Sequence, residues 1–316
     1  MALSTIGGSS NVKQRVEDEI FKQGGDLRGS SFKALMFSAL GMSIVILVIL
    51  MVDVLIDGWS VLTTRLGGFL TGTLRSQSTD ELLGISQGLI GSFWIAAFVI
   101  VLSFPIGISS AIYLEEYATE GRLTKVIDIA IRNLAGVPSV VYGLLGLFLF
   151  VNTNQGQSTL AAGGITLAIL VLPIVVITSA EAIRAVPESL RQGAYGVGAT
   201  KWDVIRTQVL PFAAPGILTG TLLSLSRAVG EAAPLILVGA ITGRLAARDR
   251  SVFSPEQLTD RFTAMPIVIV GWVQEAARDV GFAAAAGAAI VVLLVLVIAM
   301  NSIAVLLRNH FEKKRG

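Results

Sequence analysis

Cysteine is absent from the 316 residues of this chain, and charged residues are scarce. Without cysteine the chain can form no disulfide, no thiolate nucleophile and no thiolate metal ligand. Only 15% of the residues are charged, whereas 53% are hydrophobic and the mean hydropathy is +0.75. Because charged residues must coat a soluble core, this composition indicates that the chain is dissolved in lipid.

Histidine and catalytic motifs are also nearly missing. The one histidine, His310, stands beside the basic residues of the C-terminal tail, and we assign it no function. No Gly-x-x-x-x-Gly-Lys-Ser/Thr or His-Glu-x-x-His motif occurs, and an intramembrane hydrolase that uses an aspartate would rest on Asp53 alone. The net charge of +2 is small and its basic residues are spread along the chain, so no nucleic-acid partner is expected.

Long uncharged runs predict about six transmembrane helices, because a helix needs about 20 apolar residues to cross the hydrocarbon layer. The run from 134 to 180 holds two crossings, separated by the polar turn-formers of residues 152–159. The run at 262–273 is too short to span, and we expect it to lie on or dip into the outer part of the assembly. The other expected spans are residues 34–56, 85–114 with Pro105 as a kink, 209–240, and 282–307, which opens on small residues suited to close packing.

The Lys and Arg residues predict that both termini lie in the cytoplasm. With the N-terminus inside, 16 basic residues fall in the inside segments and 7 in the outside segments, as the positive-inside rule requires. A polar leader precedes the first span, whose apolar core is too long for a signal peptide. The expected organisation is a flexible leader at 1–33, a transmembrane domain at 34–307 and a cytoplasmic tail at 308–316.

The loop at 184–211 is too charged to span a membrane, and its pattern predicts two short helices. One interpretation is an interfacial helix pair that rests on the lipid headgroups. The helix signals are Pro187 and Glu188 at the start of the first helix, Gly198 at its end, Thr200 as the cap of the second, and Pro211 as its stop.

Arg227 and Glu231 interrupt the fifth apolar run near its middle. An arginine at the centre of a membrane helix costs about 2.5 to 3.5 kcal/mol on insertion scales, so something must offset it. The spacing of four residues permits a self-neutralising pair that faces the bundle interior. The alternative is a functional pair, in which the arginine fork attracts an oxyanion and the acid tempers its field. Gly230 and Pro234 suit a helix that lines a gated path.

The loop at 184–211 resembles the cytoplasmic loop of ABC importer permeases, whose Glu-Ala-Ala, three residues, Gly and final Leu-Pro pattern docks into an ATPase. The match runs through Gln192-Gly193-Ala194, Gly198 and Leu210-Pro211, with Gln192 in place of the family's Glu. Because Gln192 is neutral, it can make only ordinary hydrogen bonds there. The resemblance implies that the residues that couple to the ATPase are Glu188, Gln192, Gly193, Ala194, Gly198 and Trp202.

The string from Leu225 to Leu235 resembles the Arg-Ala-Ile-Gly-Glu-Thr-Ala-Pro-Leu signature of PstA-type phosphate permeases, with Ala232 in place of Thr. This resemblance implies that Arg227 and Glu231 lie in the path of phosphate. Other segments that resemble the same family are 107–117, 137–143, 260–266 and 301–308, so that the likeness covers about residues 85–310.

These resemblances imply an all-α membrane protein with the type I ABC importer (MetI-like) permease fold in the bacterial inner membrane. The chain would be a transporter subunit and no enzyme, would bind no cofactor and would leave ATP and Mg to a partner ATPase. The implied partners are a PstC-like permease, a PstB-like ATPase dimer, a periplasmic PstS-like phosphate-binding protein and membrane lipid. A secondary transporter or channel would need no docking loop, and an added role in signalling phosphate flux stays open.

Overall fold

The computed structural model describes residues 27–119, 121–154, 156–243 and 254–313. The chain forms two compact units, Met1–Asp53 and Val54–Gly316. Within the described ranges the secondary structure is helical, and extended backbone pairs only at the isolated bridge between Thr73 and Leu83. In the part of the chain that the structure describes, five helices are long and apolar enough to cross a membrane, or six if one bent pair is a single span. The predicted all-α membrane fold is therefore confirmed.

The first span is longer than the sequence predicted. Helix α2 covers Leu27–Thr64, so it begins inside the stretch that we assigned to the leader and continues past residue 56. The remaining leader, residues 1–26, lies outside the described residues. The large apolar side chains of α2 between Leu35 and Leu50 are exposed, as a helix in contact with lipid requires.

The second span is continuous from Ser86 to Tyr117, close to the predicted 85–114. It consists of α4 (Ser86–Phe98), a π-helical turn η1 (Val99–Ser103), α5 (Phe104–Ile112) and a second π-helical turn η2 (Tyr113–Tyr117). Pro105 is the second residue of α5, one residue beyond the end of η1. A proline donates no hydrogen bond to the preceding turn, and the wider π-helical turn accommodates that loss within one unbroken span.

The third predicted span is wrong at its start. Residues 122–135 form a separate helix, α6 (Arg122–Ala135), and the chain then bends by 96° before α7 (Ser139–Gly146) and the π-helical turn η3 (Leu147–Val151). Pro138 explains the bend, because the residue before a proline is driven out of the helical region. The 13 residues after the bend extend only about 20 Å at 1.5 Å per residue, short of a bilayer core.

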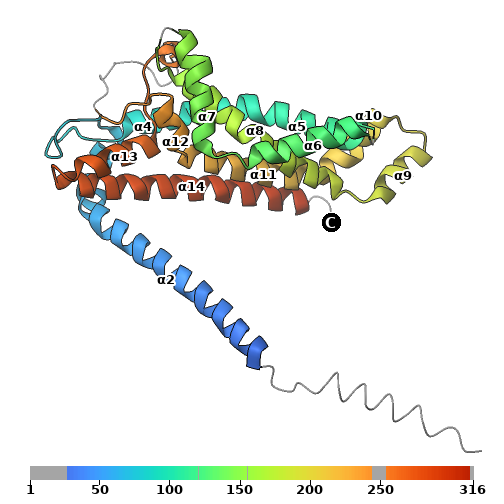
Figure 1. Ribbon diagram of the computed structural model, residues 1–316, viewed down its shortest axis with the longest axis horizontal. Helices are drawn as coiled ribbons and strands as arrows, with labels where there is room; N and C mark the ends of the chain where they lie inside the picture. Colours follow the sequence, from blue (N-terminus) through green and yellow to red (C-terminus); the bar gives the residue numbers. More distant parts are fainter. Residues whose placement is uncertain (1–26, 120, 155, 244–253, 314–316) are drawn as a thin grey trace, which may run out of the picture. The chain divides into compact units, whose positions relative to one another are not determined.

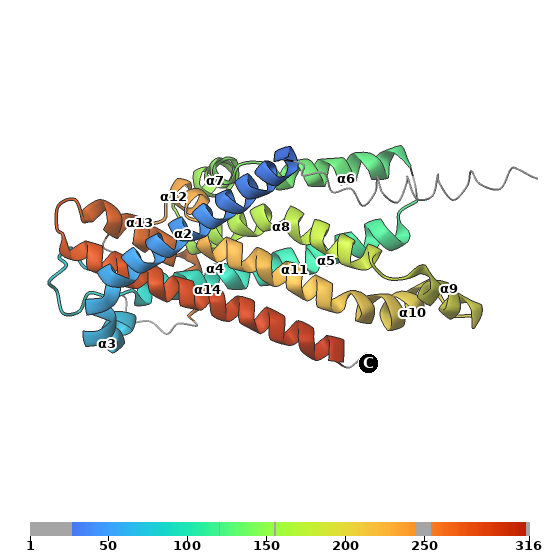
Figure 2. The same cartoon turned by 90° about the horizontal axis from the view of Figure 1, so that it is seen from below.

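Helix α8 (Leu160–Arg184) is the fourth predicted span and the centre of the second unit. Thr159 caps its first turn by accepting a hydrogen bond from the backbone N–H of Ala162 at 3.2 Å. About two thirds of its apolar window is buried, and it packs against α4, α5, α7 and α11 (Figures 1 and 2). A helix that is apolar on all sides and covered by neighbours is the core of a membrane bundle.

The fifth span is shifted from the predicted 209–240. One helix runs from Lys201 to Gly230 through α10 (Lys201–Val204), the π-helical turn η5 (Ile205–Val209) and α11 (Leu210–Gly230). Pro211 therefore does not end a helix as predicted, because η5 absorbs its missing donor. The helix ends before Glu231 instead, and a short helix α12 (Ala233–Leu237) follows.

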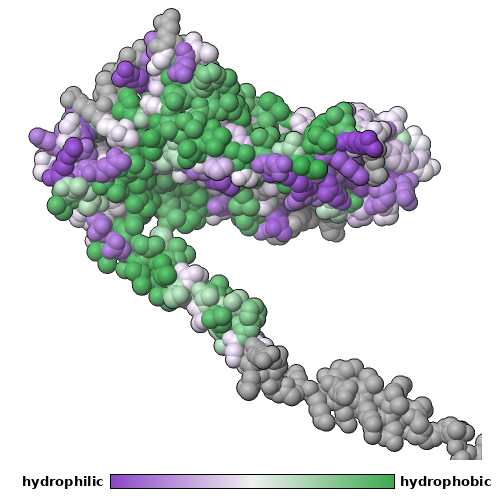
Figure 3. Space-filling view, viewed as in Figure 1, coloured by the Kyte–Doolittle hydropathy of each residue, from purple (hydrophilic) through white to green (hydrophobic). Residues whose placement is uncertain are grey.

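The last span is α14 (Gly281–Lys313), as the sequence predicted. The small residues at its start pack closely, since a Cβ on Gly58 of α2 would lie 2.6 Å from the backbone nitrogen of Ala288. The preceding α13 (Met265–Glu275) is too short to span, as expected, but its buried face packs against α4 and α14. Figure 3 shows hydrophobic residues over the middle of the bundle and hydrophilic ones gathered toward its ends.

Candidate functional site

The structure separates the residues that the sequence singled out into two sites. Arg227 and Glu231 lie where α11 ends and α12 has not yet begun. The remaining residues lie in the α9 loop, residues 185–200, and at the start of α10. Figures 1 and 2 show α9 and α10 at one end of the bundle, with α13 and α3 (Leu66–Thr71), which is labelled in Figure 2, at the opposite end. We call these the loop end and the opposite end.

The break after α11 places a carboxylate and a guanidinium at a helix terminus. Glu231 has extended backbone angles, φ −82° and ψ 116°, which end the helix that Gly230 completes. Arg227 Nη2 and Glu231 Oε1 are 3.8 Å apart, which is an ion pair but too long for a hydrogen bond. Their side chains are 59% and 22% exposed. The self-neutralising pair therefore exists, yet the arginine fork is not saturated by its partner.

Arg227 points away from the core of its own chain. Its neighbours Ala228 and Val229 are buried, whereas most of the Arg227 side chain is open to the surface of the second unit. An arginine in an apolar span does not face lipid, because a charge there must meet a partner group or water. This face of α11 therefore faces a second subunit or an aqueous path once the chain is in a membrane.

A hydrogen bond that sequence reasoning missed holds α11 beside this charged pair. Ser226 Oγ contacts Asn301 Oδ1 on α14 at 2.6 Å and the carbonyl oxygen of Leu222 at 3.0 Å. Ser226 is buried, so the contact lies inside the helix packing. A lone asparagine within a long apolar run was the available signal, because polar side chains in such runs join helices.

The first loop helix forms as predicted. Helix α9 covers Glu188–Gly196 with Pro187 as its N-cap residue. Gly198 has φ +85°, its N–H donates to Tyr195 O, and the N–H of Ala199 donates to Ala194 O. These two bonds are a Schellman motif, which requires a left-handed residue and so favours glycine. Gly198 thus ends the helix for the reason the sequence suggested.

The second loop helix starts with the predicted cap. Thr200 and Asp203 form a capping box, in which the Thr200 side chain accepts from the Asp203 backbone and the Asp203 carboxylate accepts in return. Trp202 then lies 54% exposed in the first turn of α10. The Lys201 ammonium lies 5.1 Å from the ring centre of Tyr117, which ties α10 to the end of η2.

The α9 loop presents one exposed face and one buried face. Ala194 packs against the core at this end of the bundle, and Arg191 is buried below the helix. The exposed face combines polar and apolar groups with little hydrogen bonding, which suits a docking surface better than a lipid contact. Its exposed residues include Glu188, Leu190, Gln192, Gly193, Tyr195, Val197 and Gly198, and Trp202 at the start of α10 is exposed as well.

The opposite end holds a polar pocket close to the end of α12. Ser158 Oγ donates to Val238 O at 2.7 Å, and Gly239 has φ +90° beside it. The pocket has a volume of about 430 Å³. Its lining residues are Gly156, Gln157, Ser158, Gly239, Ile241, Thr259 and Arg261. Among the described residues no group of three or more His, Asp or Glu side chains could hold a metal ion.

An apolar bundle with a charged helix break and an exposed charged loop defines a transport permease. The family described as binding-protein-dependent transport system inner membrane component matches residues 103–315. A relative from Mycobacterium tuberculosis (strain CDC 1551 / Oshkosh), the phosphate transport system permease protein PstA 1, is 37% identical over 67% of this chain and 70% of its own. The chain therefore belongs to this family of inner membrane transport components.

Two solved structures share its fold. The bacterial alginate ABC transporter in complex with a pentasaccharide-bound periplasmic protein matches with a TM-score of 0.61 and 14% identity, over 88% of this chain and 93% of its own. The MetNI methionine ABC transporter matches with a TM-score of 0.53 and 19% identity, over 72% and 94%. The predicted type I ABC importer (MetI-like) permease fold is thus confirmed.

Proposed function

We propose that this chain is the transmembrane permease subunit of an ATP-driven phosphate importer and forms half of its translocation path. The observation that carries the proposal is Arg227, whose side chain is 59% exposed at the helix break after α11. A planar guanidinium that is only loosely paired can bind two oxygens of a phosphate ion. Glu231 at 3.8 Å reduces the net field, so the anion can also leave.

The second half of the path would come from a PstC-like permease on the exposed face of α11. Arg227 needs a partner on that face, and a second permease with a facing polar path would supply it without exposing the charge to lipid. The polar pocket with Arg261 would then lie where the anion enters, because only the five residues of α12, about 8 Å of helix, separate it from the break.

ATP hydrolysis would take place on a PstB-like ATPase dimer that binds ATP and Mg, and this chain would bind no cofactor. The exposed face of the α9 loop, with Tyr195, Val197 and Trp202, supplies aromatic and apolar groups of the kind that anchor protein interfaces. Gln192 would hydrogen-bond at the place where related permeases carry a glutamate. A periplasmic PstS-like protein would deliver phosphate at the opposite end.

This assignment places the loop end and both termini in the cytoplasm of a bacterial inner membrane. The distribution of Lys and Arg supports this orientation. The basic segments 122–132 and 184–206 and the C-terminal end of α14 fall on the same side of the topology that the sequence predicts. Figure 1 shows α9, α10 and the last turns of α14 toward the same end of the bundle. Positive residues are retained on the cytoplasmic side during insertion.

The test is ATP-dependent uptake of labelled phosphate into proteoliposomes that hold this chain with its candidate partners. We expect Arg227→Glu to abolish uptake while the complex still assembles, and Arg227→Lys to retain a part of it because the charge remains. Arg278→Glu is the matched control, since that arginine is 83% exposed outside the spans. Normal uptake by Arg227→Glu would remove the pair from the path, and uptake without ATP or partners would make the chain a channel or a secondary carrier.

A further inference from the structure

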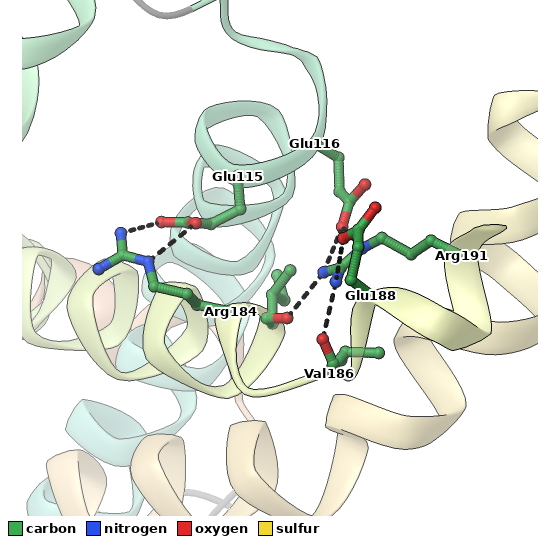
Figure 4. Close-up of polar contacts among 7 residues, drawn as sticks. Glu115, Glu116, Arg184, Val186, Glu188 and Arg191 are labelled. Atoms are coloured by element: carbon green, nitrogen blue, oxygen red, sulfur yellow. Dashed lines mark hydrogen bonds and ion pairs between the residues drawn. The ribbon is translucent and has the colours of Figure 1, made fainter.

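The Arg191 side chain on α9 is mostly covered below the loop, although its neighbours in sequence face solvent. Its side chain is 14% exposed, whereas Gln192 and Gly193 are exposed. Its Nη1 donates to Val186 O at 2.7 Å and its Nη2 donates to Ile183 O at 3.0 Å (Figure 4). These are carbonyl groups at the C-terminal end of α8, where a cation complements unpaired acceptors.

The same guanidinium binds Glu116, a residue of the second span. Arg191 Nη2 lies 3.0 Å and Nε 3.2 Å from Glu116 Oε1, and only 6% of the Glu116 side chain is exposed. Glu116 belongs to η2, so one side chain joins α9, the end of α8 and the end of the span Ser86–Tyr117. Figure 4 shows Arg191 reaching back from α9 toward Glu116 and Val186.

The chemistry of the contact makes it hard to replace. A guanidinium offers five donors in a fixed plane, and here they reach two backbone carbonyls and the carboxylates of Glu116 and Glu188, the latter at 3.3 Å from Nη1. Removing Arg191 takes the partner away from the Glu116 carboxylate, whose side chain is only 6% exposed, and this is far more costly than losing a surface pair. Helix α9 therefore cannot tilt away from η2 without breaking this contact.

We propose that Arg191 is a positioning residue that clamps α9 to the second span through Glu116, so that a displacement of the loop moves that span directly. The proposal rests on the proposed function, because the displacement would come from the ATPase. Without the clamp the loop would remain joined to the bundle by its two chain connections, by the apolar packing of Ala194 and Ala199 and by the Lys201–Tyr117 contact. Part of an imposed motion would then bend the loop and leave the span Ser86–Tyr117 in place.

A neighbouring pair supplies the matched control. Arg184 Nη2 contacts Glu115 Oε1 at 2.5 Å, so it too joins the end of α8 to η2. Arg184 is 58% exposed, and among the described residues its side chain forms its hydrogen bonds and ion pair with Glu115 and not with α9. Exposed ion pairs contribute little, so Arg184→Gln removes the same charge from the same region without releasing the loop helix.

The first experiment measures coupling in the reconstituted importer, as labelled phosphate transported per ATP hydrolysed. We expect Arg191→Gln and Glu116→Gln to lower this ratio by about fivefold or more, a factor typical of lost coupling between sites. Arg191→Lys should recover part of the loss because it keeps the charge but not the fork. Arg184→Gln should leave the ratio unchanged. A wild-type ratio in both Arg191→Gln and Glu116→Gln would overturn the clamp while the importer assignment stands.

The second experiment detects the clamp without transport. Because the chain lacks cysteine, spin labels can be placed at Tyr113→Cys on η2 and Ser189→Cys on α9, both of which are exposed and neither of which belongs to the proposed docking residues. In the assembled complex we expect a narrow distance distribution that Arg191→Gln and Glu116→Gln broaden and that Arg184→Gln does not. An unchanged narrow distribution in the two clamp variants would refute the clamp. If the wild-type complex takes up no phosphate, the importer assignment fails, but this measurement still decides whether Arg191 fixes α9.

Discussion

The hydroxyl of Ser226 on α11 donates a hydrogen bond of 2.6 Å to Oδ1 of Asn301 on α14. Ser226 immediately precedes Arg227 in the sequence. This hydrogen bond joins two long helices at the level of the charged pair, where the surrounding groups are apolar. A polar contact inside a membrane bundle fixes the rotation of both helices, because turning either one would expose an unpaired polar group to apolar surroundings. The direction of Arg227 thus depends on a residue that is far away in sequence.

Replacing Asn301 by leucine is expected to lower both stability and uptake. The loss of one interhelical hydrogen bond within a membrane costs about 0.6 kcal/mol on average and up to about 1.7 kcal/mol. Thermal unfolding of the detergent-solubilised complex measures the first effect, and labelled phosphate uptake measures the second. Ser226→Ala in the same background should add little further loss, since its partner is already gone. Additive losses from the two changes would show that the contact carries no energy.

The crossing of α2 and α14 at Gly58 and Gly287 is expected to tolerate no larger side chain. A Cβ on Gly287 would lie 2.8 Å from the Gly58 nitrogen, so Gly287→Val must push the helices apart. Overpacking of this kind costs about 1 to 3 kcal/mol. We expect a lower unfolding temperature for Gly287→Val than for Gly67→Val, because Gly67 has no other atom near its Cβ position. Equal unfolding temperatures would contradict the close crossing.

Gly198 is expected to accept asparagine but no branched or acidic residue without loss. Its φ of +85° places it in the left-handed region, which costs about 1 to 3 kcal/mol for most side chains. Asparagine enters this region more readily than other residues. ATP-dependent uptake should therefore fall in the order wild type, Gly198→Asn, Gly198→Val, and Gly198→Asp should stop it. Full uptake by Gly198→Val would mean that the Schellman motif is not needed for coupling.

Asp279 is expected to stabilise the opposite end of the bundle in a pH-dependent way. The Ser78 hydroxyl and N–H donate to its carboxylate at 2.7 and 3.0 Å and, with the N–H of Gly281, lower the pKa of Asp279. Because the folded pKa lies below the unfolded value, this stabilisation is present above the unfolded pKa and is lost as pH falls through the folded pKa.

The measurement is the unfolding temperature of wild type and Asp279→Asn across that acidic range. The two proteins should differ at neutral pH and converge as the carboxylate of the wild type becomes protonated. A difference that stays constant down to the lowest pH would assign the effect to the shape of the side chain and not to its charge.

The apolar runs predicted the fold class and most of the spans because a lipid environment leaves little choice of secondary structure. Three of the errors fall at prolines. Pro138 turns the chain by 96°, whereas Pro105 and Pro211 are carried through their spans by π-helical turns. A sequence pattern shows that a proline removes a donor, but the packing of the neighbouring helices decides whether the chain bends or widens.

The two candidate sites were predictable to different degrees. Arg227 and Glu231 stood out because charge is rare in an apolar run, and the helix signals of the α9 loop are local. Glu116 and Arg191 did not stand out, since charged residues are common outside the spans and the pair is separated by 75 residues. Only folding of the second span against the end of α8 brings these two side chains together and buries them.

The π-helical turn η5 also sets the angular offset between the α9 loop and the charged break. A turn of this kind contains one residue more than an α-helical turn, and each residue of an α-helix accounts for about 100° of rotation. Deleting one residue between Ile205 and Val209 would restore a regular helix and leave Arg227 at nearly the same angle to Trp202, whereas a regular helix that kept all these residues would rotate Arg227 by about 100°. The composition of the span would not change in that second case, but its charged face would point in another direction. The π-helical turn, and not the residue types alone, therefore sets the direction of that face.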